Sequence, residues 1–64
     1  MLLKTYLLYI HHDRSGVPKL EVITAPNDSA ARDLARQRLD ESPHHRLVEI
    51  WEDDRAVGRI ENID

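Results

Sequence analysis

The sequence predicts an α+β fold, in which a four-stranded, mainly antiparallel sheet carries one helix packed on one face, in the order β-β-α-β-β. Three observations support this. One stretch in the middle of the chain, 27–41, has apolar residues at helical spacing. A pair of strand-like segments lies on each side of it, and turn residues separate the two members of each pair. These elements use almost all of the 64 residues, so we expect a single domain, 1–64.

The first strand is expected over 4–12, where β-forming residues are dense and apolar side chains alternate. Residues 13–16 supply a turn, which Gly16 suits because glycine accepts a positive φ. The chain returns as a second strand over 17–24. Since Pro18 cannot donate to a ladder, this strand lies at an edge of the sheet or begins after the proline.

The helix is expected to begin at Asn27 or Asp28, either of which can cap it, with the acid at its positive end. It ends before Ser42 and Pro43, because the residue before a proline leaves the helical region. Its apolar stripe is narrow, which suggests that the helix lies close to the sheet. The stripe consists of Ala31, Leu34, Ala35 and Leu39.

The last hairpin is expected to pair 46–51 with 55–62. A two-residue loop would mix charged residues of the second strand into the apolar face of the first. A three-residue loop, 52–54, gives one apolar face and is the register we expect, because a slip of one residue reverses every side chain. That face would consist of Val48, Ile50, Ala56, Gly58 and Ile60.

One helix covers only one face of a four-stranded sheet, and the other face is expected to be rich in large apolar side chains. We place Leu20 and Val22 toward the helix and Ile23 on this second face. Its candidate interface residues are Leu7, Tyr9, Ile23, Leu47, Trp51 and Val57. Such a patch favours a sheet-to-sheet homodimer or a protein docking face. The alternative is that the strands curl and bury part of the patch internally.

Four histidines occur as two adjacent pairs, and the chain direction predicts that both pairs lie at the same end of the sheet, near Asp13. The pairs are His11 with His12 and His44 with His45. Together with the carboxylate they are candidate ligands for zinc or another divalent ion. However, neighbours in a strand point to opposite faces, so each pair offers one ligand per face at most. Histidines at loop ends are more often simply solvated, and we expect no cofactor.

No pattern of residues predicts catalysis. The acids Glu52, Asp53 and Asp54 stand at a hairpin turn, where aspartate suits the turn geometry, and they lie at the opposite end from the histidines. The chain has no Gly-x-Ser-x-Gly elbow, and its two glycines cannot form a phosphate-binding loop. We therefore expect a protein that is not an enzyme.

Composition limits the remaining classes. The net charge is −3 and 33% of the residues are charged, with both signs mixed, so we do not expect nucleic acid as a partner. The apolar N-terminal run is broken by Lys4 and Thr5 and has no cleavage site, and no run approaches the ~20 residues that span a bilayer. The chain has no cysteine, so disulfides cannot supplement a small core. These points predict a cytoplasmic protein without a membrane partner, and they favour a homodimer.

Two segments, 27–35 and 47–59, carry a resemblance to small proteobacterial proteins of β-β-α-β-β plan and unknown function. The second segment is similar to their hairpin of valine, glutamate, aliphatic residue and tryptophan, followed by an acidic turn and arginine. The resemblance implies a bacterial source and no activity. A fainter similarity is to antitoxins of the HicB kind, which also place a hairpin before an alanine-rich helix, although this chain lacks their Gly-Cys segment.

Three hypotheses about function follow. The first is a small non-enzymatic homodimeric module for protein interaction that uses the second sheet face. The second is a small-ligand or divalent-metal-binding protein that uses the histidine end. The third is a regulator related to the antitoxins.

Overall fold

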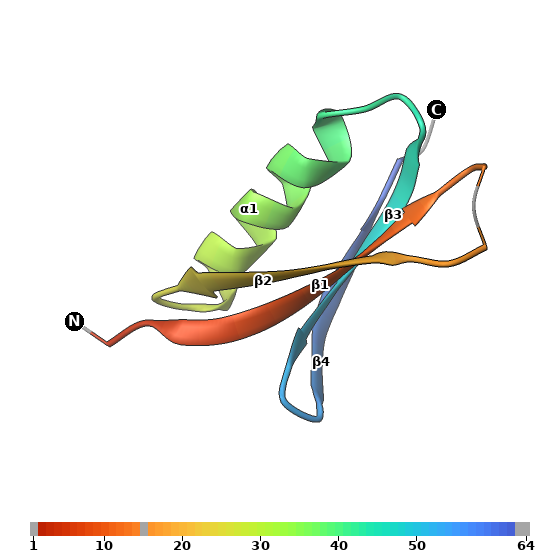
Figure 1. Ribbon diagram of the computed structural model, residues 1–64. Helices are drawn as coiled ribbons and strands as arrows, with labels where there is room; N and C mark the ends of the chain where they lie inside the picture. Colours follow the sequence, from red (N-terminus) through yellow and green to blue (C-terminus); the bar gives the residue numbers. More distant parts are fainter. Residues whose placement is uncertain (1, 15, 63–64) are drawn as a thin grey trace.

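The computed structural model describes residues 2–14 and 16–62, and it confirms the α+β class (Figure 1). Its elements are β1 (Lys4–His12), β2 (Lys19–Ala25), α1 (Asp28–Asp40), β3 (His45–Glu52) and β4 (Arg55–Glu61). The strands form one antiparallel sheet in the order β2-β1-β3-β4, and α1 packs on one face of it. Among the described residues, no helix has the length and hydropathy needed to cross a bilayer.

The helix returns the chain from the edge strand β2 to β3, which pairs with β1 in the middle of the sheet. The expectation from Pro18 is confirmed, since β2 lies at an edge and begins at Lys19. The other edge is β4. As a result, β1 and β3 contribute the largest fully buried side chains. These are Tyr6, Leu8, Ile10, Val48 and Ile50.

The helix begins and ends for the reasons read from the sequence. The side chain of Asn27 accepts a hydrogen bond from the backbone N–H of Ala30 at 2.8 Å, which satisfies one of the free donors of the first turn. The last helical residue is Asp40, just before Ser42 and Pro43. The predicted apolar stripe is confirmed, with three members buried and Leu34 partly buried. The buried members are Ala31, Ala35 and Leu39.

The loop of the last hairpin differs from the prediction. It has two residues, Asp53 and Asp54, and Glu52 is the last residue of β3. The prediction of one apolar face nevertheless holds in part, because β4 contains a bulge. Ile50 pairs with Gly58, while Trp51 pairs with Ala56.

Val57 is thus the extra residue in the ladder, and the bulge changes which face each residue of β4 occupies. Gly58 and Ile60 keep the expected side, beside Ile50 and Val48. Ala56 turns to the opposite face, so its predicted place on the same face as Val48 and Ile50 is wrong. A Cβ placed on Gly58 would lie 3.4 Å from Nε of Arg32, which shows how closely α1 approaches β4.

Candidate interaction face

The face of the sheet away from α1, here called the open face, carries an apolar row that crosses all four strands. Leu7 pairs with Val22 on one side and with Trp51 on the other, and Trp51 pairs in turn with Ala56. Directly paired residues of antiparallel strands lie on the same face. The row therefore runs from one edge of the sheet to the other, and no other element of residues 2–14 and 16–62 covers it (Figure 1).

The structure places four predicted interface residues on the open face. They are Leu7, Tyr9, Leu47 and Trp51, and all four are half-buried by their neighbours in the sheet. The apolar character extends to the edge strand, where Leu20 is 57% exposed and Val22 is 67% exposed. Large apolar side chains left this accessible next to an aromatic centre are typical of a surface that binds another molecule.

The placement of Ile23 was wrong. Ile23 pairs with Tyr6, belongs to the core and is 8% exposed. The two faces of β2 are therefore exchanged relative to the prediction, and Leu20 and Val22 lie on the open face. Glu21 faces the helix and accepts a hydrogen bond from Nε of Arg38 at 2.7 Å. This contact, together with Glu41, raises the pKa of the Arg38 guanidinium.

The placement of Val57 on the open face was also wrong, because the bulge turns its side chain into the core, where it is 8% exposed. The bulge is held from the helix side, since the guanidinium of Arg32 donates to the carbonyl oxygen of Val57 at 3.3 Å. Ala56 takes the place on the open face that the prediction gave to Val57.

Charged residues border the apolar row on the open face. Nε2 of His11 lies 2.8 Å from Oε1 of Glu49, and Arg59 forms an ion pair with Glu61. An open hollow of about 390 Å³ lies at the end of the face near the last hairpin turn. Two aromatic rings, an aliphatic side chain and three carboxylates line it. These residues are Leu7, Tyr9, Trp51, Glu49, Asp53 and Asp54.

The predicted meeting of the two histidine pairs at one end of the sheet is confirmed. The rings of His12 and His45 are in edge-to-face contact, with centroids 4.9 Å apart. Nδ1 of His44 lies 3.4 Å from Oδ1 of Asp13. Nδ1 of His45 lies 2.6 Å from the carbonyl oxygen of Arg38 in the last turn of α1. Because a carbonyl only accepts, Nδ1 of His45 carries a proton and caps the C-terminus of the helix.

The histidines do not form a single ligand set. His11 points to the open face and contacts Glu49, whereas His12 and His45 lie together near the helix end. Within the part of the chain that the structure describes, no group of three or more histidine and acidic side chains is arranged to hold a metal ion. The geometry thus assigns the buried His45 a structural contact.

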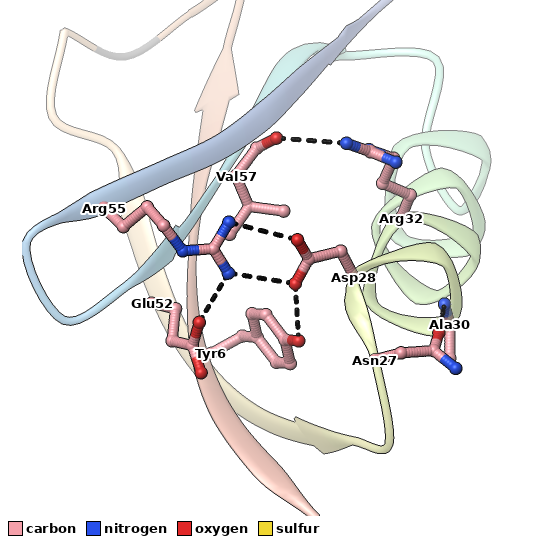
Figure 2. Close-up of polar contacts among 8 residues, drawn as sticks. All are labelled: Tyr6, Asn27, Asp28, Ala30, Arg32, Glu52, Arg55 and Val57. Atoms are coloured by element: carbon pink, nitrogen blue, oxygen red, sulfur yellow. Dashed lines mark hydrogen bonds and ion pairs between the residues drawn. The ribbon is translucent and has the colours of Figure 1, made fainter.

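A polar cluster that sequence reasoning missed joins β1, α1 and the last hairpin (Figure 2). Asp28, the first residue of α1, accepts one hydrogen bond from the Tyr6 hydroxyl at 2.8 Å and two from Arg55 at 3.0 Å. Arg55 also donates to Glu52. Sequence reasoning treated Asp28 only as a cap, and no local signal links it to residues 22 and 27 positions away.

The cluster shifts the pKa of each of its central groups. Hydrogen bonds from Arg55 and Tyr6 lower the pKa of Asp28 to about 2. Burial and the hydrogen bond to Asp28 raise the pKa of Tyr6 to about 12. The two carboxylates raise the pKa of Arg55. Both carboxylate oxygens of Asp28 accept hydrogen bonds from within the chain, so the cluster links the helix start to the last hairpin and we take the open face as the candidate site.

No family model matches this chain, and no curated protein and no solved structure is significantly similar to it. The arrangement of elements and the geometry of the open face are therefore the basis for assigning a function.

Proposed function

We propose that the protein is a small non-enzymatic module that forms a homodimer through the open face and can dock a protein partner there. The observation that carries this proposal is the apolar row from Val22 through Leu7 and Trp51 to Ala56. An aromatic centre with exposed aliphatic neighbours is the composition of interface cores.

The size of the face supports association. Four strands about 4.8 Å apart and about eight residues long, at ~3.3 Å per residue, define a face of roughly 500 Å². Two such faces in contact would bury roughly 1,000 Å² in total, which is the lower limit for a specific interface. A dimer of this size also compensates for the small core of a 64-residue chain without disulfides.

The setting we propose is the bacterial cytoplasm. The chain has no cysteine, and a fold without disulfides suits a reducing compartment. The resemblance of the tryptophan hairpin to small proteobacterial proteins agrees with this setting and adds no activity.

Replacement of Trp51 with glutamate tests the proposal, because it adds a charge within the apolar row of the open face, between Leu7 and Ala56. Sedimentation equilibrium of the untagged chain should show a dimer that dissociates on dilution, and Trp51→Glu should be monomeric at the same concentrations. Gln37→Glu is the matched control, because Gln37 is exposed on α1; it should leave the dimer unchanged. A wild-type monomer at all concentrations, or a Trp51→Glu variant as dimeric as wild type, would refute the proposal.

A further inference from the structure

The two edges of the sheet differ in how their outward backbone groups are protected. An edge strand leaves a row of backbone N–H and C=O groups on its outer side, where another strand can pair with them. Bulges, prolines and charged side chains prevent such pairing. β4 has the bulge at Val57 and three charged residues among its seven, and Arg32 of α1 donates to the carbonyl oxygen of Val57.

β2 lacks this protection. All of its residues pair with β1 without a register shift, and Pro18 stands before the strand rather than within it. Its charged residues are Lys19 at the first position and Glu21, which contacts Arg38 on the helix side. Among the described residues, no strand pairs with the outer side of β2. This side is therefore open to another strand.

Apolar exposure lies at the same edge of the sheet. The exposed large apolar side chains of the described residues all precede residue 23, and they lie in β2 or in the segments that lead into β1 and β2. They are Leu2, Leu3, Val17, Leu20 and Val22. β4, which is described throughout, contributes none of them. An apolar strand with an open edge is the usual site at which an extended segment adds to a sheet.

The sequence of β2 is suited to pairing with a second copy of itself. A two-fold axis perpendicular to the sheet makes the two β2 strands antiparallel and keeps both helices on the same side of the joined sheet. With this axis at Val22, residues 19–25 of one copy face residues 25–19 of the other, and no like charges are opposed. The facing pairs are Lys19 with Ala25, Leu20 with Thr24, Glu21 with Ile23, and Val22 with itself.

The neighbouring registers are less favourable. An axis at Glu21 would place two carboxylates opposite each other, which is destabilising, and would shorten the paired segment to 19–23. An axis at Ile23 would shorten it to 21–25. The register centred on Val22 is therefore the one that uses the whole strand.

Pairing of this kind ends with two copies. Each β2 edge is covered by the other, because the contact is symmetric. The outer edges of the joined sheet are then the two β4 strands, which the bulge at Val57 and the charged residues protect. The result is a closed assembly rather than a growing sheet.

We propose that the β2 edge is a second self-association site, at which β2 of one copy pairs antiparallel with β2 of another around Val22. Two four-stranded sheets then form one sheet of eight strands. The inference goes beyond the open-face homodimer, since edge pairing leaves both open faces on the same uncovered side. Pairing between two short strands is weak in water, so this contact forms at higher protein concentration than the open-face dimer.

Backbone amide hydrogen exchange, measured by NMR on the wild-type chain at low and high protein concentration, tests the proposal. The β2 amides that do not bond to β1 should exchange rapidly in dilute solution and about tenfold more slowly at high concentration. The outward amides of β4 are the matched control and should exchange rapidly at both concentrations. Contact between open faces leaves both edges in water, so it does not produce this difference.

Single cysteines test the register, because the chain has none of its own. In a redox buffer, and in the Trp51→Glu background that removes the open-face contact, Val22→Cys should form about tenfold more cross-linked dimer than Thr24→Cys. The reason is that residue 22 faces its own copy, whereas residue 24 faces residue 20. A mixture of Leu20→Cys and Thr24→Cys should cross-link to each other.

The outcomes separate this inference from the proposed function. Outward β2 amides that exchange at the same rate at every concentration overturn the edge contact and leave the open-face dimer in place. A Val22→Cys variant that cross-links no more than Thr24→Cys overturns the proposed pairing as well. The proposed function fails separately, through a Trp51→Glu variant that is as dimeric as wild type at low concentration.

Discussion

Replacement of Val57 with alanine tests the bulge that assigns the residues of β4 to the two faces. The structure places Val57 in the core, 8% exposed, and the neighbouring Ala56 on the open face. Without the bulge, Ala56 would face the helix and Val57 would face away from it. If the bulge is absent, substitution of Ala56 should therefore be the more destabilising of the two, and substitution of Val57 the less.

The expected cost follows from the groups removed. Val57→Ala deletes two methyl groups from a buried site, each worth about 0.8 kcal/mol, which gives about 1.6 kcal/mol before any cost of the cavity. For a domain of this size, 1 kcal/mol corresponds to roughly 4–8 °C in Tm. We therefore expect Tm to fall by roughly 6–13 °C. Ala56→Ser, at an exposed position, should change the unfolding free energy by less than about 0.5 kcal/mol.

Urea unfolding followed by circular dichroism, at one fixed protein concentration, measures both variants. The concentration must be fixed because association contributes to apparent stability. An Ala56→Ser variant that loses as much stability as Val57→Ala, or more, would show that the bulge is absent and that the faces of β4 are exchanged.

Three further predictions concern the helix start and the last turn. Asn27→Ala should lower the unfolding free energy by about 1 kcal/mol in urea titrations, whereas Asn27→Asp, which keeps the cap, should not. The pKa of Asp28 is lowered from 3.8 to about 2, so its stabilisation is present above pH 4 and is lost as the pH falls toward 2. The difference in Tm between wild type and Asp28→Asn should therefore shrink from pH 5 to pH 2, and a constant difference would contradict the cluster. Asp53 has a φ of 53°, so Asp53→Gly should stabilise the fold by up to about 1 kcal/mol and Asp53→Val should destabilise it by about 1–2 kcal/mol in thermal melts.

The elements were predictable from local patterns, because their signals lie within a few residues of each other. Asn27 marks the start of α1, Pro43 follows its end, and Pro18 precedes an edge strand, as each does for steric or hydrogen-bonding reasons. The chain direction was also enough to bring His12 close to His45.

The face of the sheet on which each side chain lies was less predictable, since it depends on pairing between distant segments. In β2 the more apolar alternating set, Leu20 and Val22, lies on the open face, and the set with two charged residues faces the helix. That choice is stabilised by Ile23 against Tyr6 and by the contact of Glu21 with Arg38, which α1 supplies. The alternation of apolar and polar residues within β2 gives no information about either contact, because both partners lie in other elements.

The bulge at Val57 and the cluster around Asp28 escaped prediction for a similar reason. The bulge was hidden because a two-residue loop with a bulge and a three-residue loop give the same apolar positions at Gly58 and Ile60. The cluster required Arg55 and Tyr6 to approach from other strands. The structure places four of the six predicted interface residues on the open face, and the exposed apolar residues that the prediction left out of that face lie on the edge strands β2 and β4.

Fluorescence of Trp51 as a function of protein concentration tests the central claim most directly. It is the only tryptophan in the chain, and it lies in the apolar row of the open face, so its emission reports whether that face is covered. We predict that on dilution the emission of Trp51 shifts to longer wavelength and its indole ring becomes accessible to quenching by acrylamide. Both changes should occur over the concentration range in which the mass measured by sedimentation halves. A dimer in which Trp51 is as accessible to acrylamide as in the monomer would contradict the account.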